Sequence, residues 1–391
     1  MNRFNRYLKK ILVCFFTRNP YRVRTFAQLA GRPKGEPIDV PESFNQVLLH
    51  EPGAMIYYQP LPETIEQRLT TRFLGGQRRY RPGGILREPD RMLYSLSDGC
   101  ILGQIGVVYH RGKRAFVSES AKEWHEHLDA SPYTNILHMP ESVYLKGVTL
   151  SCLTNSAEAG FYHFIFEAVV KLKFAEKIIP HVSTFLFNGP ATEWKQNWLL
   201  RAGIDLTRIR WVENSGHYSC EQLLFTNRLI ADQQISNWCV QSLKSLFRIP
   251  AFLQPDARPP KVFLISRKDF IRNIEWEQAI LERFPSIERI DFSKFSTEET
   301  ETRMAAATHI VGAHGAALSN IFLCKPGTRV LELYPIGKTY QPCYYRISSV
   351  CDLEYSVAYL DFSNKDHPDA GIAHLQDTMD VFFNNLTSYQ V

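Results

Sequence analysis

From about residue 145 onward the chain alternates short apolar runs with amphipathic segments, and this alternation constrains the fold more than any other feature of the sequence. In the second half, β-prone runs fall at 261–265, 287–292, 309–312 and 329–333, and segments with helical apolar spacing separate them. Strands that alternate with helices form a parallel sheet covered on both faces. We therefore expect an α/β protein that binds its ligands at the carboxyl ends of its strands.

The first half repeats this pattern, and a proline-rich connection follows it. Apolar runs predict strands at 144–153, 184–187, 208–212 and 222–226, with helices over 161–179, 194–202 and 231–250. The connection then carries four prolines, Pro250, Pro255, Pro259 and Pro260. Because 391 residues exceed what one hydrophobic core usually supports, we expect two α/β domains.

Residues before 100 do not show this alternation. Residues 36–100 are rich in Pro, Gly and Arg and are expected to be irregular, whereas apolar runs around Arg111-Gly112-Lys113 predict a hairpin within 101–118. The expected domains are therefore a basic segment with an irregular extension over 1–100, a first lobe over 101–255, and a second lobe over 256–391 with a C-terminal helix.

The positive charge is concentrated at the start of the chain. The net charge is +5, and residues 1–35 hold nine basic residues and no acidic one. The apolar run at 11–16 is far shorter than the roughly 20 residues that span a bilayer. This segment is expected either to lie on an anionic membrane surface or to form an ordinary N-terminal helix. No basic stripe or known module indicates nucleic-acid binding.

The eight cysteines are scattered, without Cys-x-x-Cys pairs or zinc-ligand spacing. Cysteines of this kind are usually reduced and buried, so we expect a cytoplasmic protein that can be peripheral on the inner face of the cell membrane. A disulfide-bonded, exported form is the alternative, since the count is even.

The segment from Val311 to Asn320 turns from a strand into a helix through small residues and His314. Small residues let an anion approach the backbone, and the first amides of a helix favour negative charge. A diphosphate would fit there, although the small residues are equally explained by close helix packing.

Two further groups lie in or directly after strands. Ser266 and Arg267 follow the strand at 261–265, with Arg272 close behind, and arginine binds phosphate in a bidentate manner. The alternative is a solvated basic loop. Glu332 lies among apolar strand residues, where ribose hydroxyls or a buried ion pair would satisfy its carboxylate.

In the first half, His163 and Glu167 are four residues apart on the predicted helix and therefore share one face. Either could take a proton from an acceptor hydroxyl. A histidine satisfied within the core is the alternative.

Together these segments resemble glycosyltransferase family 61. The resemblance rests on His314 to Asn320, on Pro326-Gly327, and on the strand from Val330 to Pro335. Ser266-Arg267 with Arg272, and Tyr162-His163 with Glu167, are similar to two further family motifs, and order and spacing agree over roughly 145–360. Glu167 stands where the family usually has Asp.

The resemblance implies a GT-B-like fold, in which two Rossmann-like lobes with parallel sheets face each other across a cleft, plus the irregular or β-rich N-terminal extension. It also implies an inverting transferase with no cofactor and no metal, and no Asp-x-Asp occurs in the chain. The first lobe would take the acceptor, with Glu167 and His163 catalytic. The second would bind the donor nucleotide through Ser266, Arg267, Arg272, His314, Gly315, Ala316, Asn320 and Glu332.

The expected function is therefore transfer from a nucleotide-sugar donor, with UDP favoured, to a glycan or lipid-linked glycan in capsule, lipopolysaccharide or other surface-polysaccharide assembly. A non-catalytic nucleotide- or carbohydrate-binding protein of the same fold is the alternative. A nucleotide-sugar oxidoreductase would need a Gly-x-Gly-x-x-Gly turn, which the sequence lacks.

Overall fold

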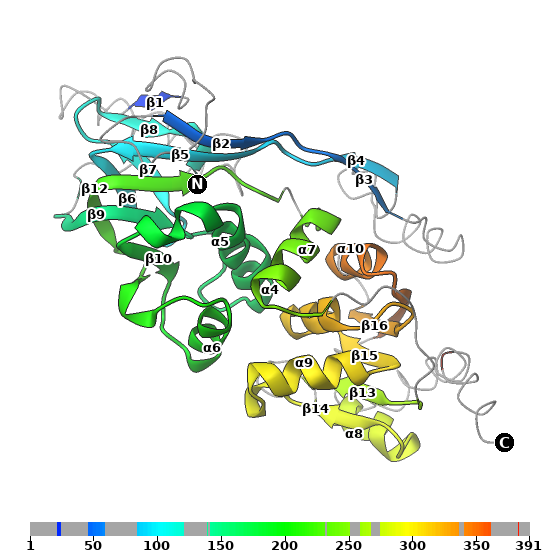
Figure 1. The fold of residues 1–391 in the computed structure, drawn as a ribbon. Helices are drawn as coiled ribbons and strands as arrows, with labels where there is room; N and C mark the ends of the chain where they lie inside the picture. The colour runs from blue at the N-terminus through cyan, green and yellow to red at the C-terminus, as the bar shows by residue number, and fades with distance from the viewer. Residues whose placement is uncertain are drawn as a thin grey trace, which may run out of the picture. The chain divides into compact units, whose positions relative to one another are not determined.

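A computed structural model describes residues 22–24, 46–58, 84–120, 139, 141–230, 233–250, 259–266, 274–335, 340–360 and 382. The chain divides into two compact units, one of Met1–Ala54 with Glu88–Asp232 and one of Met55–Arg87 with Gln233–Val391 (Figure 1). The division lies earlier than the expected boundary at 255. It also assigns a segment from before residue 100 to the C-terminal unit.

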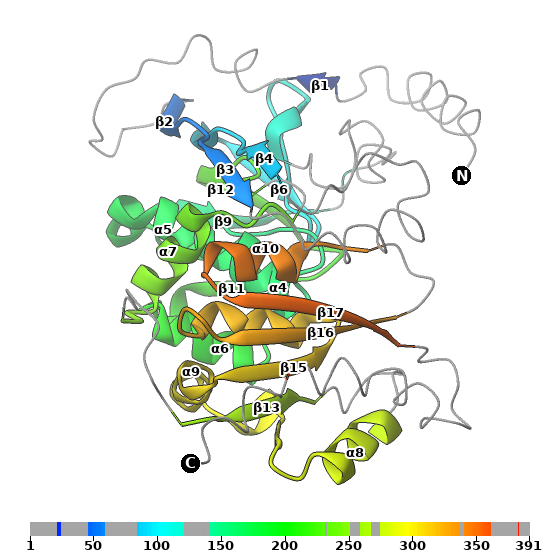
Figure 2. The ribbon, with the colours of Figure 1, turned by 90° about the vertical axis from the view of Figure 1, so that its right-hand side faces the viewer.

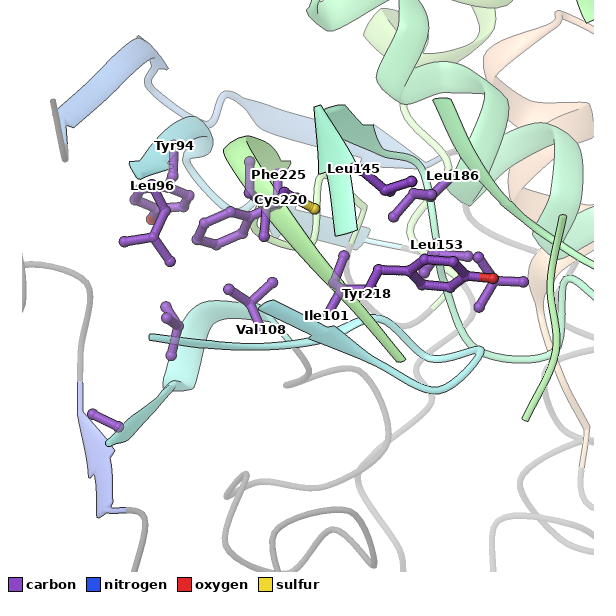
Figure 3. Close-up of a cluster of buried hydrophobic side chains, with 14 residues drawn as sticks. Tyr94, Leu96, Ile101, Val108, Leu145, Leu153, Leu186, Tyr218, Cys220 and Phe225 are labelled. Atoms are coloured by element: carbon purple, nitrogen blue, oxygen red, sulfur yellow. The ribbon is translucent and has the colours of Figure 1, made fainter. Parts of the chain in front are cut away.

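The first unit is built on a mixed sheet. Its parallel part has the order β12-β9-β10-β11, and antiparallel strands extend it beyond β12. Its strands are β1 (Arg22–Arg24), β2 (Gln46–Glu51), β5 (Arg91–Ser97), β6 (Gly99–Leu102), β7 (Val107–His110), β8 (Ala115–Val117), β9 (Val143–Ser151), β10 (Thr184–Asn188), β11 (Ile209–Val212) and β12 (His217–Thr226). Tyr94, Leu145 and Phe225 belong to its buried apolar cluster (Figure 3).

The helical segments of the first unit connect the parallel strands, as the alternation predicts. They are α4 (Phe161–His163), the π-helix η5 (Phe164–Val169), α5 (Val170–Phe174), η6 (Glu176–His181), α6 (Glu193–Arg201) and η7 (Leu206–Arg208), while η2 (Ser118–Ser120) follows β8. The expected helix over 161–179 is therefore a succession of α, π, α and 3-10 turns. The α/β class and the parallel strands are confirmed.

For the described residues 46–58 and 84–100 the prediction of irregular structure is wrong, because β2, β5, β3 (Met55–Tyr58) and β4 (Gly84–Arg87) lie there, which agrees with the β-rich alternative for the N-terminal extension. The turn signal at Pro52-Gly53 separates β2 from β3 and does not mark a long loop. The apolar run from Ile101 to Tyr109 is likewise two strands, β6 and β7, since Gly103 and Gly106 adopt positive φ between them.

The sheet of the second unit is entirely parallel, with the order β14-β13-β15-β16-β17 (Figure 2). Its strands are β13 (Val262–Ile265), β14 (Glu288–Ile290), β15 (His309–Ala313), β16 (Arg329–Pro335) and β17 (Glu354–Leu360). Its helices are α7 (Asn237–Leu246), α8 (Ile274–Arg283), η8 (Phe292–Lys294), α9 (Thr297–Ala306), η9 (Ala316–Leu323) and α10 (Cys343–Val350). Strand order reverses between β13 and β15, and ligands bind at such switch points.

The β3–β4 hairpin supplies part of the core of this unit. Ile56 and Tyr58 are buried along β3, whereas Met55 and Tyr57 are exposed. Ile56 and Tyr58 belong to a buried, largely aromatic cluster. Its other members are Tyr334, Tyr340 and Tyr345, and the partly buried Leu86, Val350, Tyr355 and Val357 pack against it. The Tyr58 hydroxyl also donates to the carbonyl of Ile235 at 2.7 Å. Residues from before 100 therefore complete an aromatic core in the C-terminal unit.

The buried His309 on β15 makes the stability of this unit sensitive to acid. Burial, with a smaller contribution from Arg329, lowers the pKa of His309 to about 4. As pH falls below about 6.5, His309 becomes protonated in the unfolded chain but stays neutral in the folded protein. The free energy of unfolding therefore decreases until about pH 4. Between these pH values the free energy of unfolding, measured with urea, is expected to decrease by up to about 3 kcal/mol more in the wild type than in His309→Gln. Equal losses in the two proteins would contradict this assignment.

Candidate active site

The topological switch point of the second unit is flanked by two of the residues expected to bind the donor. Ser266 directly follows β13 and His314 directly follows β15, and these two strands pair in parallel through Ile265 and Gly312. Their carboxyl ends therefore lie at the same edge of the sheet. The fold brings Ser266 and His314 to the place where α/β sheets of this order bind ligands.

The His314 imidazole is held by a buried carboxylate and by aromatic rings. Its Nδ1 lies 2.5 Å from Oε1 of Glu332, a residue of β16 that is 0% exposed. The rings of Tyr334 and Tyr344 pack against the imidazole with centroid distances of 4.6 and 5.1 Å. The ring orientation is thus fixed from several sides.

Both carboxylate oxygens of Glu332 are engaged within the protein. Oε2 accepts a hydrogen bond from the hydroxyl of Tyr355 on β17, while Oε1 pairs with His314. The arrangement matches the buried-pair alternative for Glu332. The carboxylate orients the imidazole, and a ribose would have to displace one of its present partners.

Two other expected donor residues are engaged in the same way. The Ser266 hydroxyl donates to Oε2 of Glu277 on α8 at 2.8 Å, and both residues are buried. Asn320 donates to the carbonyl of Ala317 at 2.9 Å and is 2% exposed. Arg267 and Arg272 lie outside the described residues, and phosphate binding by them stays a prediction.

The turn after His314 leads into a 3-10 helix, η9, in place of the expected α-helix. Gly315 is its N-cap, and His314, Gly315 and Ala316 are half-buried at the edge of the sheet, whereas the residues from Leu318 to Leu323 are buried. The small residue Gly312 serves close packing, because a Cβ there would lie 3.1 Å from Leu318 Cδ1. Gly312 therefore serves packing, whereas Gly315 and Ala316 stay half-buried at the edge of the sheet.

The first unit holds a second histidine–glutamate pair. His163 Nδ1 lies 2.9 Å from Oε2 of Glu167, and the same oxygen accepts the hydroxyl of Thr154 at 3.3 Å. The expected shared face is confirmed. Glu167 is 7% exposed and lies in the π-helix η5, while the His163 side chain is 25% exposed. Turns of π-helix occur frequently at functional sites.

A buried polar network fixes the loops around this pair. Asn188, at the end of β10, accepts from the Thr154 amide and donates to the carbonyls of Thr154 and Gln104. Lys195 Nζ donates to the carbonyls of Glu158, Asn188 and Pro190 at 2.7, 2.9 and 3.2 Å. Burial lowers the pKa of Lys195 to about 8. The loops that follow β9 and β10 are therefore joined by one ammonium group.

Glycine at position 160 is required by the position of the imidazole. A Cβ on Gly160 would lie 2.7 Å from the Ser156 carbonyl oxygen and 3.1 Å from Cδ2 of His163. Any larger residue would displace the helix start or the His163 ring.

Several of these supporting residues carry no signal in the sequence. Thr154 and Lys195 lie beside other polar residues, Asn188 ends an apolar run, and Glu277 and Tyr355 fit ordinary helix and strand patterns. The positions of Thr154 just after β9, of Asn188 at the end of β10 and of Tyr355 on the strand next to Glu332 become informative only once strand order and register are known.

In each unit a histidine–glutamate pair thus lies near the carboxyl ends of the parallel strands. A family model described as Glycosyltransferase 61 matches residues 161–331, which span His163, Glu167, Ser266 and His314. Over these residues the chain is similar to glycosyltransferase family 61, and the match supports a glycosyltransferase enzyme. No curated protein matches the chain.

The described part of the chain has three further features relevant to the site. It contains no group of three or more His, Cys, Asp and Glu residues arranged to hold a metal ion. None of its helices combines the length and apolar character needed to cross a bilayer. Its seven cysteines are buried and free; Cys14 lies outside the described residues.

Proposed function

We propose that this glycosyltransferase moves a sugar from a nucleotide-sugar donor, with a UDP-sugar favoured, to a hydroxyl of a glycan or lipid-linked glycan, with inversion and without a metal ion. The observation that carries the proposal is the presence of two histidine–glutamate pairs, one near the carboxyl ends of the parallel strands of each unit. One pair suits a departing diphosphate and the other suits an attacking hydroxyl.

On the donor side, His314 and the backbone of Gly315 and Ala316 meet the diphosphate in this proposal, together with Arg267 and Arg272. Nδ1 of His314 pairs with Glu332, so Nε2 is the ring nitrogen left to face the diphosphate, and it donates to a phosphate oxygen when both ring nitrogens carry a proton. We expect no direct contact with the diphosphate from Ser266, Asn320 and Glu332, because their side chains are buried and hydrogen-bonded within the unit. They support the residues that contact it. Fixed donors of this kind stabilise developing negative charge.

On the acceptor side, His163 is the general base and Glu167 orients it. Because Nδ1 of His163 pairs with Glu167, the proton of the acceptor hydroxyl passes to Nε2. The freed oxygen forms a bond to the anomeric carbon as the bond from that carbon to the diphosphate breaks, and the diphosphate leaves with the electron pair. Glu167 stabilises the resulting imidazolium.

The finer architecture and cellular context belong to the same proposal. We extend the proposal to a GT-B arrangement with two Rossmann-like lobes facing across a cleft, which the parallel strands of each unit support, and to work in surface-polysaccharide assembly such as that of capsule or lipopolysaccharide. The basic residues 1–35 would hold the enzyme peripherally on the anionic inner face of the cell membrane, with its active site in the cytoplasm.

A ligand-binding panel tests the donor part of the proposal. UDP, GDP, CMP and their common sugar conjugates are added in the presence of a chelator, and the melting temperature is measured. A ligand present at about 100 times its Kd stabilises the folded state by about 2.7 kcal/mol, which raises the melting temperature by several degrees. UDP and one UDP-sugar are expected to give this shift, and Arg267→Ala is expected to abolish it. A chain that binds none of these nucleotides would overturn the proposal.

A further inference from the structure

A chain of hydrogen bonds runs behind His314 into the aromatic core of the second unit. Tyr355 donates its hydroxyl proton to Oε2 of Glu332, and the hydroxyls of Tyr340 and Tyr355 lie 2.7 Å apart. A phenol hydroxyl can donate only one hydrogen bond, and Tyr355 donates to the Glu332 carboxylate. In the hydrogen bond between the two tyrosine hydroxyls the donor is therefore Tyr340. The chain therefore runs from Tyr340 to Tyr355 to Glu332, which pairs with His314.

The two outer groups of this chain, Tyr340 and Glu332, are buried, and the side chain of Tyr355 between them is half-buried. Glu332 is 0% and Tyr340 is 1% exposed, and burial beside Glu332 raises the pKa of Tyr355 well above its ordinary value. The Tyr355 hydroxyl thus keeps its proton throughout the physiological range. A buried carboxylate without such donors would be costly, so each hydroxyl contributes directly to the state of the next group.

We propose that Tyr355, supported by Tyr340, is a positioning residue of the donor site. It keeps the Glu332 carboxylate oriented, and Glu332 in turn holds the Nδ1 side of His314, so that Nε2 faces the diphosphate. The inference rests on the proposed function. It adds two residues beyond the region that matches the family, which ends at residue 331.

Tyrosines in an aromatic cluster can also serve packing alone. A substitution at a neighbouring tyrosine of the cluster distinguishes a packing role from a positioning role. Tyr345 packs its ring edge-on against Tyr355 with a centroid distance of 5.6 Å, in the same buried cluster. Tyr345→Phe and Tyr355→Phe remove the same atom from the same core. Only the second removes the donor to Glu332.

The direct test follows the His314 ring by 15N NMR on protein labelled at its histidines, with His314→Gln used to assign the signals. In Tyr355→Phe the Nδ1 signal of His314 is expected to shift, in Tyr340→Phe to shift in the same direction by less, and in Tyr345→Phe to stay in place. Unchanged His314 signals in a folded Tyr355→Phe protein would overturn the positioning role. Equal shifts in Tyr355→Phe and Tyr345→Phe would overturn it as well.

Calorimetric titration with UDP then separates this inference from the function on which it rests. Loss of a hydrogen bond to a charged group should weaken UDP binding about tenfold in Tyr355→Phe and leave Tyr345→Phe within about twofold of wild type. A wild-type protein that binds no nucleotide refutes the proposed donor site, whereas the NMR experiment still decides the link from Tyr355 to His314. Wild-type affinity in Tyr355→Phe refutes the positioning role.

Discussion

Replacing His163 with glutamine is expected to lower kcat by about 10²- to 10⁴-fold, because general-base catalysis contributes a factor of this size. The glutamine side chain is polar and similar in length but cannot accept the proton of the acceptor hydroxyl. Nucleotide affinity should change little, since the donor residues belong to the other unit. The measurement is release of nucleoside diphosphate from the donor that the binding panel identifies, in the presence of a panel of glycan acceptors.

Glu167→Gln should lower kcat in the same direction but by less, since the base itself remains. The two substitutions should not be additive, because both act on one hydrogen-bonded unit. His181→Gln is the matched control, as His181 is exposed at the end of η6 in the same unit. If His163→Gln kept near wild-type kcat and Glu167→Gln lost activity, the carboxylate would be the base and the roles proposed for the pair would be reversed.

Lys195→Met is expected to destabilise the first unit by about 3–5 kcal/mol. The methionine fills similar space but leaves the buried carbonyls of Glu158, Asn188 and Pro190 without their shared donor. The melting temperature of the unit should fall by roughly 10 °C, as followed by differential scanning calorimetry. Activity below that temperature should also fall, because the loop before α4 carries His163 toward the edge of the sheet.

Lys173→Met provides the comparison for this stability effect. Lys173 lies on α5 in the same unit, and its ammonium pairs with the exposed Glu176 at the surface. Surface pairs contribute up to about 1 kcal/mol, so the melting temperature should change by only a few degrees. Similar losses in both variants would mean that the three carbonyl contacts of Lys195 do not stabilise the loops.

Strands and helices from about residue 143 onward could be predicted from apolar periodicity, because each parallel strand is buried on both faces and each connecting helix on one. The strands before residue 100 could not be predicted in this way. β3 and β4 are four residues each and are flanked by Gly and Pro, so their local signal is that of turns. What makes them strands is the aromatic surface formed by Tyr334, Tyr340 and Tyr345.

The candidate site also has some features that could be predicted from the sequence and others that could not. His163 with Glu167, and Ser266 with His314, could be predicted because they follow strands or share a helix face. The sequence could not show that Glu332 is enclosed by His314 and Tyr355, since that contact depends on the register between β16 and β17. Positions in a motif thus identify which residues take part, while sheet register decides which of them meet the ligand.

The position of the β3–β4 hairpin has a consequence for synthesis of the protein on the ribosome. Tyr58 emerges before most of the first unit and long before Tyr334, Tyr340 and Tyr345, against which its strand packs. At about 5–20 residues per second, the delay is on the order of tens of seconds. During that time the first unit can fold. The apolar side chains of the hairpin stay exposed, because the C-terminal residues against which they pack have not yet been synthesised. We therefore expect chaperone dependence during expression to be concentrated in this segment, and a C-terminal fragment that begins after residue 233 to aggregate unless residues 55–87 are supplied with it.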